Sequence, residues 1–157
     1  MMSKGDDSSP DTDVLPFSVT LHVRDTCLCL HLQRAARAVA RLFDEALRPV
    51  GLTNGQFSLL MSLNRPQPPL MRDVATLLAM DRTTLTAMLK PLARRGLLEV
   101  AQDEKDRRGR RLILTGEGRA LLASAMPIWT RTHAAIDAML PPGSGPERLR
   151  DDLRRLS

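Results

Sequence analysis

The sequence of 157 residues predicts a mainly α-helical fold with one small β-hairpin. Apolar residues recur at helical spacing over most of the chain. The pattern changes to that of strands only near residues 97–101 and 110–115. Stretches rich in proline and glycine, at 65–69 and 141–146, separate the periodic segments. The length suits one domain with a real core.

The N-terminal part is expected to combine a disordered acidic tail with a long helix. Residues 1–20 are rich in Ser, Asp, Gly and Pro and contain little that could be buried. A helix is expected over residues 20–48, and Pro49 and Gly51 end it. The rest of the chain, residues 21–157, is expected to form a single domain.

Three helices are expected in the middle of the chain. Thr53 and Asp81 precede the first and the third and can cap them. Pro91 lies inside the third helix and is expected to bend it. In order, the expected segments are a helix over 53–63, a rigid connector over 65–69, a helix over 71–78, a tight turn at 79–80 and a helix over 82–95, closed by Gly96.

A hairpin and two further helices are expected in the C-terminal part. The strands at 97–101 and 110–115 are joined by a charged tip at 102–109. Thr115 can cap the next helix, which Pro127 is expected to interrupt. The expected helices cover 116–140 and 147–156.

The charge distribution favours a polyanionic partner. The chain has a net charge of +5. Residues 1–20 hold one Lys and four Asp, a net charge of −3, which leaves +8 on the other residues. A body this basic indicates nucleic acid first. Aromatic residues make up only 3% of the chain, which argues against a binder that stacks single-stranded bases.

Composition also excludes several classes of protein. No apolar run approaches the ~18 residues of a membrane span, so no membrane partner is expected. The N-terminus lacks the pattern of a signal peptide, and two cysteines cannot build a disulfide framework. A cytoplasmic location is therefore expected. No motif of an enzyme, a cofactor site or a metal site is found, so no activity, cofactor or metal is expected.

The helices expected at 71–78 and 82–95 match a helix-turn-helix, whose second helix enters the major groove of DNA. The start of that second helix carries short hydroxyls and a cation, which can reach phosphates and base edges. An ordinary capped helix with a polar outer face is the alternative. The residues concerned are Arg82, Thr83, Thr84 and Thr86.

The expected hairpin tip is rich in cations, which suits the narrow, electronegative minor groove. Asp106 is expected to hold the guanidinium of Arg108 in a fixed direction. A solvated charged turn is the alternative. The cations are Lys105, Arg107, Arg108, Arg110 and Arg111.

Three segments resemble the multiple-antibiotic-resistance regulator (MarR) family. They are LTNGQFSLLMSL (52–63), DRTTLTAMLKPLARRGLL (81–98) and DRRGRRLILTGEG (106–118). The resemblance covers about residues 25–125 and implies a homodimeric winged helix-turn-helix, at 51–115, that binds roughly palindromic double-stranded DNA. It also implies dimerisation helices at 21–48 and 116–157. Members are usually repressors that a small molecule or an oxidant releases.

The resemblance assigns functional residues to this chain. Arg108 is assigned to the minor groove, and the helix opened by Thr53 and Asn54 borders the phosphates. The other assigned DNA-binding residues are Asp81, Arg82, Thr83, Thr84, Thr86, Lys90, Asp106, Arg107 and Arg110.

The terminal segments give an independent reason to expect a homodimer. They carry more apolar surface than a small winged domain needs for its own core. A two-fold dimer would bury that surface and place two reading helices one DNA turn, ~34 Å, apart. A monomer with folded-back terminal helices is the alternative.

Cys29 resembles the sensing cysteine of the organic-hydroperoxide branch of the family, in its distance from Arg37 and from the Leu-Thr-x-x-Gln motif. That branch holds its thiolate with tyrosine hydroxyls, whereas this chain has no tyrosine. Gln33 and Phe43 occupy the corresponding places. Cys29 is thus either a redox sensor or a small buried hydrophobe. In one regular helix Cys27 would lie ~200° from it, badly placed for a disulfide.

Two further expectations concern ligands and partners. The family resemblance implies a site for a small aromatic acid or phenol between the DNA-binding part and the dimer helices, with Arg37, Trp129 and His133 as lining residues. The alternative function for the whole chain is a winged-helix protein–protein interaction module without DNA binding.

Overall fold

The computed structural model describes residues 14–157. The first 13 residues of the expected tail lie outside this range. A helix, α1, covers Phe17–Thr26, so the expectation of disorder is wrong for residues 17–20. Pro16 has a φ of −60° and starts the helix, and its carbonyl accepts a hydrogen bond from Val19 N–H at 3.0 Å.

The long helix expected over residues 20–48 is two helices. The second, α2, covers Leu28–Leu47, and Cys27 between them is extended, with φ −70° and ψ 104°. The hydroxyl of Thr26 donates to the carbonyl of His22 at 2.7 Å and closes the last turn of α1. Cys27 and Cys29 therefore do not share one regular helix. The chain divides into two compact units between Arg37 and Ala38, inside α2.

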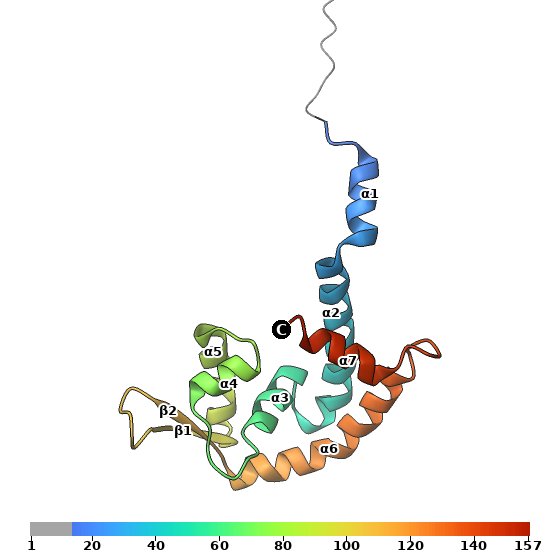
Figure 1. Ribbon diagram of the computed structural model, residues 1–157. Coiled ribbons are helices and arrows are strands. Elements are labelled where there is room, and N and C mark those ends of the chain that lie inside the picture. Colours follow the sequence, from blue (N-terminus) through green and yellow to red (C-terminus); the bar gives the residue numbers. More distant parts are fainter. Residues whose placement is uncertain (1–13) are drawn as a thin grey trace, which may run out of the picture. The chain divides into compact units, whose positions relative to one another are not determined.

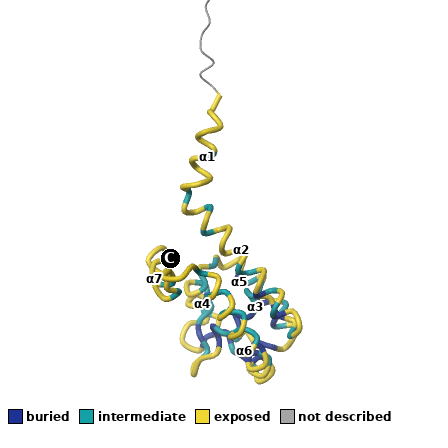
Figure 2. The backbone as a smooth tube through the Cα atoms, turned by 90° about the vertical axis from the view of Figure 1, so that its right-hand side faces the viewer, coloured by how far each residue is buried: buried dark blue, intermediate teal, exposed yellow. Residues whose placement is uncertain are grey.

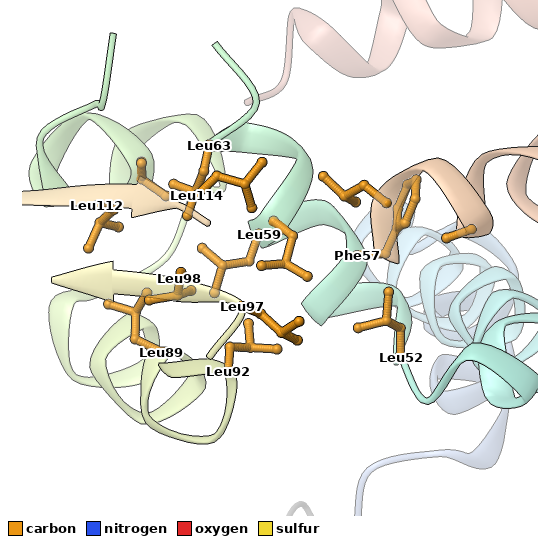
Figure 3. Close-up of a cluster of buried hydrophobic side chains, with 14 of the residues drawn as sticks. Leu52, Phe57, Leu59, Leu63, Leu89, Leu92, Leu97, Leu98, Leu112 and Leu114 are labelled. Carbon is orange, nitrogen blue, oxygen red and sulfur yellow. The ribbon is translucent and has the colours of Figure 1, made fainter. Parts of the chain in front are cut away.

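The second unit contains the helix-turn-helix and the hairpin (Figure 1). Its core is a cluster of leucines contributed by helices and strands alike, and Figure 3 shows part of this cluster. The elements are η1 Arg48–Val50, α3 Asn54–Ser62, α4 Met71–Leu77, α5 Arg82–Arg94, β1 Leu98–Gln102, β2 Arg110–Leu114, α6 Gly116–Asp137 and α7 Pro146–Arg154.

The expected caps are confirmed. Thr53 and Gln56 form a reciprocal capping box at the start of α3. Asp81 accepts from the N–H of Thr84 at 2.8 Å and caps α5. Thr115 accepts from the N–H of Gly118 at 3.0 Å and caps α6. Local side-chain chemistry therefore sets where these three helices begin.

The hairpin is antiparallel, with Leu98 opposite Leu114. The proline-rich connector adds a second, short pairing, which was not expected from the sequence. The N–H of Leu112 donates to the carbonyl of Pro69 at 3.0 Å, and Leu70 forms an isolated bridge with Arg111. The connector before α4 is thereby tied to the second strand of the hairpin.

The expectation that Pro127 interrupts α6 is wrong, because the helix runs unbroken to Asp137. A proline removes one backbone hydrogen bond, and the apolar face around it offsets that loss. Leu122 and Ala125 of that face are buried, and Trp129 packs against the core. None of the helices in residues 14–157 is long and apolar enough to cross a membrane.

Candidate nucleic-acid interface

The hairpin, the start of α4 and the start of α5 enclose a groove of about 330 Å³, which we call the wing groove. Cations lie along it together with an apolar part formed by Leu70, Met71 and Ala75. The structure thus brings together residues that are widely separated in the sequence. The full lining is Leu70, Met71, Arg72, Ala75, Arg82, Asp103, Asp106, Arg108, Gly109 and Arg110.

The outer face of α5 carries a second, shallower hollow of about 320 Å³, which we call the α5 hollow. Arg82, Thr83, Thr86, Ala87 and Lys90 line it. Arg82 lines both depressions, so the reading helix and the hairpin present adjoining surfaces. Four of the five lining residues are among the DNA-binding residues assigned from the sequence.

Asp81 is committed to the protein itself. One carboxylate oxygen accepts from the N–H of Thr84 and the other from its hydroxyl, at 2.8 and 2.6 Å. The hydroxyl of Thr84, followed by its N–H, holds the pKa of Asp81 below its usual value. Asp81 is therefore an anion at neutral pH that fixes the start of α5.

The expected contact between Asp106 and the guanidinium of Arg108 is not found. The carboxylate of Asp106 instead accepts from the backbone N–H of Arg108 at 3.0 Å. A short Asp side chain reaches a backbone two residues ahead more readily than the end of a long side chain. Asp106 shapes the turn from which Arg108 projects.

Other hydrogen bonds stiffen the tip of the hairpin. The carbonyl of Arg107 accepts from Gln102 Nε2 at 2.8 Å and from Arg110 Nη1 at 3.1 Å. Arg107 and Arg108 are exposed at the tip. The backbone of the tip is thus held while its guanidinium groups stay open to solvent.

The sequence does not reveal a half-buried ion pair at the root of the hairpin. Arg111 Nε donates to Asp103 at 2.6 Å, and Asp103 is only 5% exposed. Arg111 Nη1 also donates to the carbonyl of Pro68 at 2.7 Å. The Arg111 guanidinium holds the pKa of Asp103 below its usual value. In the strand register Ala101 is paired with Arg111, and Asp103 lies two residues beyond Ala101, so Asp103 and Arg111 are diagonal neighbours across the hairpin.

Thr53 and Asn54 are set apart from both depressions. The N–H of Asn54, at the start of α3, donates to Asp44 of α2 at 2.6 Å. A carboxylate of the protein thus occupies the position that an anion would take at this helix start. Neither residue lines the wing groove or the α5 hollow.

The two cysteines are free, and they differ in exposure. Cys29 is exposed and Cys27 is half-buried. Gln33 Nε2 donates to Cys29 Sγ at 3.3 Å, and Arg37 Nη2 donates to Gln33 Oε1 at 3.4 Å. Within residues 14–157 no group of three or more metal-ligating side chains is present.

Two of the three residues expected to line a ligand site, Trp129 and His133, belong to an aromatic stack. The ring of Trp129 lies 4.7 Å from that of His133 and 6.3 to 6.4 Å from those of Phe57 and Phe43. Trp129 thus joins α6 to α2 and α3.

Comparisons with known proteins give consistent results. Residues 52–109 match the MarR family. The structure of the Mycobacterium tuberculosis transcriptional regulator MosR in complex with DNA is 39% identical to this chain. It aligns with 83% of this chain and 92% of its own, with a TM-score of 0.74.

Two curated relatives align over shorter stretches. The transcriptional regulator TtmR of Methylorubrum extorquens is 32% identical over 97 residues, which are 62% of this chain and 50% of TtmR. The organic hydroperoxide resistance regulator of Bacillus subtilis is 28% identical over 101 residues, 64% of this chain and 69% of that protein. This chain spans about half the length of the first of these relatives. With its winged-helix fold and its match to MosR over nearly the whole of that protein, the chain belongs to the MarR family.

Proposed function

We propose that this chain is a sequence-specific regulator of transcription that binds double-stranded DNA and acts as a homodimeric repressor. One observation carries the proposal. Arg82 of the reading helix lines the same groove as Arg108 and Arg110 of the hairpin. A single cationic surface can therefore meet a major groove and the neighbouring minor groove together.

In this proposal α5 enters the major groove and the hairpin tip enters the minor groove. Among the described residues no carboxylate forms an ion pair with Arg82, Lys90 or Arg108. These cations are therefore free to meet DNA. Asp106 and Gln102 hold the turn, so less conformational entropy is lost when the tip is inserted.

Unused apolar surface supports the homodimer. Helices α1 and α7 contain no buried residue (Figure 2). Among the apolar side chains on them, Phe17, Val23 and Leu149 are 71%, 51% and 42% exposed. Burial of such surface against a second copy would be favourable at about 25 cal/mol per Å². The palindromic operators implied by the family resemblance would match that two-fold symmetry.

Replacement of Arg108 by alanine tests the proposal. We expect R108A to bind its operator about 1–3 kcal/mol more weakly, because a groove-inserted guanidinium is lost. The measurement is a mobility-shift titration with duplexes selected from a random pool. R131A, on the exposed side of α6, removes the same charge elsewhere and should weaken binding much less. Equal affinities of R108A and the parent protein would reject the assigned role of the hairpin.

The alternative is a winged helix that binds another protein. Such a face would favour exposed apolar anchors over arginines and threonines. Fluorescence anisotropy with mixed duplex DNA separates the two functions. No binding at low salt would favour the protein-interaction module.

We further propose that oxidation of Cys29 releases DNA. Cys29 is exposed, and an amide N–H of Gln33 points at its sulfur, so a thiolate there would keep one hydrogen bond without any tyrosine. The likeness to the hydroperoxide regulator of B. subtilis agrees with this role. A small aromatic acid or phenol is the alternative effector.

An oxidant titration tests the role of Cys29. Treatment with an organic hydroperoxide should abolish DNA binding by the parent protein and by C27S, and should spare C29S. If C29S is released as readily as the parent protein, the thiol has a structural role only.

A further inference from the structure

The hydrogen bonds within α5 limit what its hydroxyls can recognise. The Thr86 hydroxyl donates to the carbonyl of Arg82 at 2.7 Å, and the Thr84 hydroxyl donates to Asp81 at 2.6 Å. A hydroxyl has one hydrogen to donate and two lone pairs that accept. In this arrangement both hydroxyls use their one donor within α5 and its cap, and each keeps lone pairs that can accept.

Only one of these two hydroxyls belongs to the α5 hollow. Thr86 lines the hollow, whereas Thr84 does not. The hollow is also lined by Thr83 and by Ala87, whose side chain is a single methyl group. A base edge that enters the hollow beside Ala87 would thus meet the Thr86 acceptor and a small apolar surface. The Thr83 hydroxyl, one turn earlier on α5, can donate or accept and so does not discriminate between the bases.

The two ends of the hollow have the opposite polarity. Arg82 and Lys90 carry donors and no acceptor, and neither is in an ion pair within residues 14–157. They are eight residues apart on α5, which corresponds to ~12 Å along a helix. That length spans about three to four base-pair steps.

The major-groove edges of the bases differ in the groups that would match this surface. Adenine N6 and cytosine N4 are donors, whereas guanine N7 and O6 and thymine O4 are acceptors. An acceptor-only hydroxyl meets the amino groups favourably and repels the guanine and thymine oxygens. Arg82 and Lys90 have the reverse preference.

We propose that Thr86 determines specificity by accepting a hydrogen bond from the exocyclic amino group of an adenine or a cytosine at the centre of each half-site. Arg82 and Lys90 favour guanine on either side of that base. The inference rests on the proposed function, since it names the bases that the reading helix would select.

The test combines a substitution of Thr86 with removal of a single exocyclic amino group from the DNA. The duplex is an operator selected in vitro with the chain of 157 residues. Each adenine is replaced in turn by purine, which lacks the N6 amino group, and each cytosine by 2-pyrimidinone, which lacks N4. The proteins are the parent, T86V, which keeps the shape and a methyl group, and T86S, which keeps the hydroxyl.

We expect one position per half-site at which loss of the amino group weakens binding by the parent about three- to tenfold, the net value of one hydrogen bond. The same change should leave binding by T86V unaltered, and T86S should behave as the parent does. T130V is a matched control, because the Thr130 hydroxyl on α6 donates in the same way, to the carbonyl of Met126 at 2.9 Å. T130V should retain the parent's sensitivity to each amino group.

Two outcomes would overturn the inference, and they differ in what else they reject. If the protein binds its operator but every loss of an amino group weakens binding by T86V as much as binding by the parent, the assignment of Thr86 is wrong and the proposed function stands. If the parent protein selects no duplex at all, the proposed function fails and the inference fails with it.

Discussion

Asp103 illustrates how one buried carboxylate can set the position of a functional loop. Its charge is balanced by Arg111, which also donates to the carbonyl of Pro68. The same carboxylate accepts from the N–H of Asp106 at 3.2 Å. Loss of Arg111 would leave the buried carboxylate of Asp103 without its counter-charge, which is much less favourable than loss of an exposed pair.

The lowered pKa of Asp103 gives stability a defined pH dependence. Its ionised form is favoured in the folded state, so its contribution is present above the ordinary Asp pKa of ~3.9 and is lost as the pH falls through the lowered value. We expect D103N to be less stable than the parent at pH 7 and to lose less stability between pH 6 and pH 3. Urea unfolding at a series of pH values measures both effects.

Asp151 provides the matched control for this prediction. It forms an ion pair with Arg154 on the exposed surface of α7. D151N should change the unfolding free energy little, because exposed pairs contribute about 0–1 kcal/mol. If D103N followed the parent's pH profile, Asp103 would not be the group whose titration destabilises the fold in acid.

The junction between the hairpin and α6 shows why Thr115 and Gly118 occur together. The Thr115 hydroxyl donates to the carbonyl of Gly96 at 2.7 Å while it accepts from the N–H of Gly118. A side chain at Gly118 would place its Cβ only 2.1 Å from the carbonyl oxygen of Leu97. The start of α6 can lie this close to the hairpin only with glycine at that position.

Replacement of each of two neighbouring glycines by alanine tests this packing. G118A should destabilise the protein by about 2 kcal/mol or more, because backbone must move to relieve the clash. G116A should be neutral or stabilise by about 0.5 kcal/mol, because a Cβ there meets nothing within 4 Å. Thermal unfolding compares the two variants. Similar losses of stability in G118A and G116A would show that helix propensity decides the effect, and not the close approach of Gly118 to the backbone.

Elements with local signals could be predicted from the sequence. Thr53, Asp81 and Thr115 each cap a helix within three residues of themselves, so short-range spacing was sufficient. The break at Cys27 has no such signal, because neither proline nor glycine marks it. The pairing of Leu70 with Arg111 spans a long stretch of chain and depends on tertiary packing.

The same distinction holds for the candidate site. The arginines and threonines of α5 and the hairpin could be identified because their residue types are typical of DNA contacts. The groups with which these side chains form hydrogen bonds could not be identified from the sequence. Asp106 and Arg108 are near neighbours, yet their contact runs through the backbone of Arg108 rather than through its guanidinium.

The whole molecule has an uneven charge distribution, with +8 on residues 21–157. We expect operator binding to weaken steeply with salt, because cations released from the phosphates favour association. Six to eight phosphate contacts by a homodimer correspond to a slope of about −5 to −7 in a plot of log affinity against log salt concentration. Anisotropy titrations between about 50 and 200 mM salt measure the slope.

Sedimentation of the protein alone and with operator completes this test. A dimer on one palindromic duplex is expected. A monomer with a slope near zero would contradict both the dimer and the electrostatic basis of binding.

The stack around Trp129 gives the molecule a built-in optical probe. The chain has one tryptophan and no tyrosine, so ultraviolet emission excited at long wavelength arises from a single indole. That indole touches rings from α2 and α3 and the imidazole of its own helix. Any rearrangement that separates these three helices would therefore change the colour or intensity of the emitted light, without an added dye.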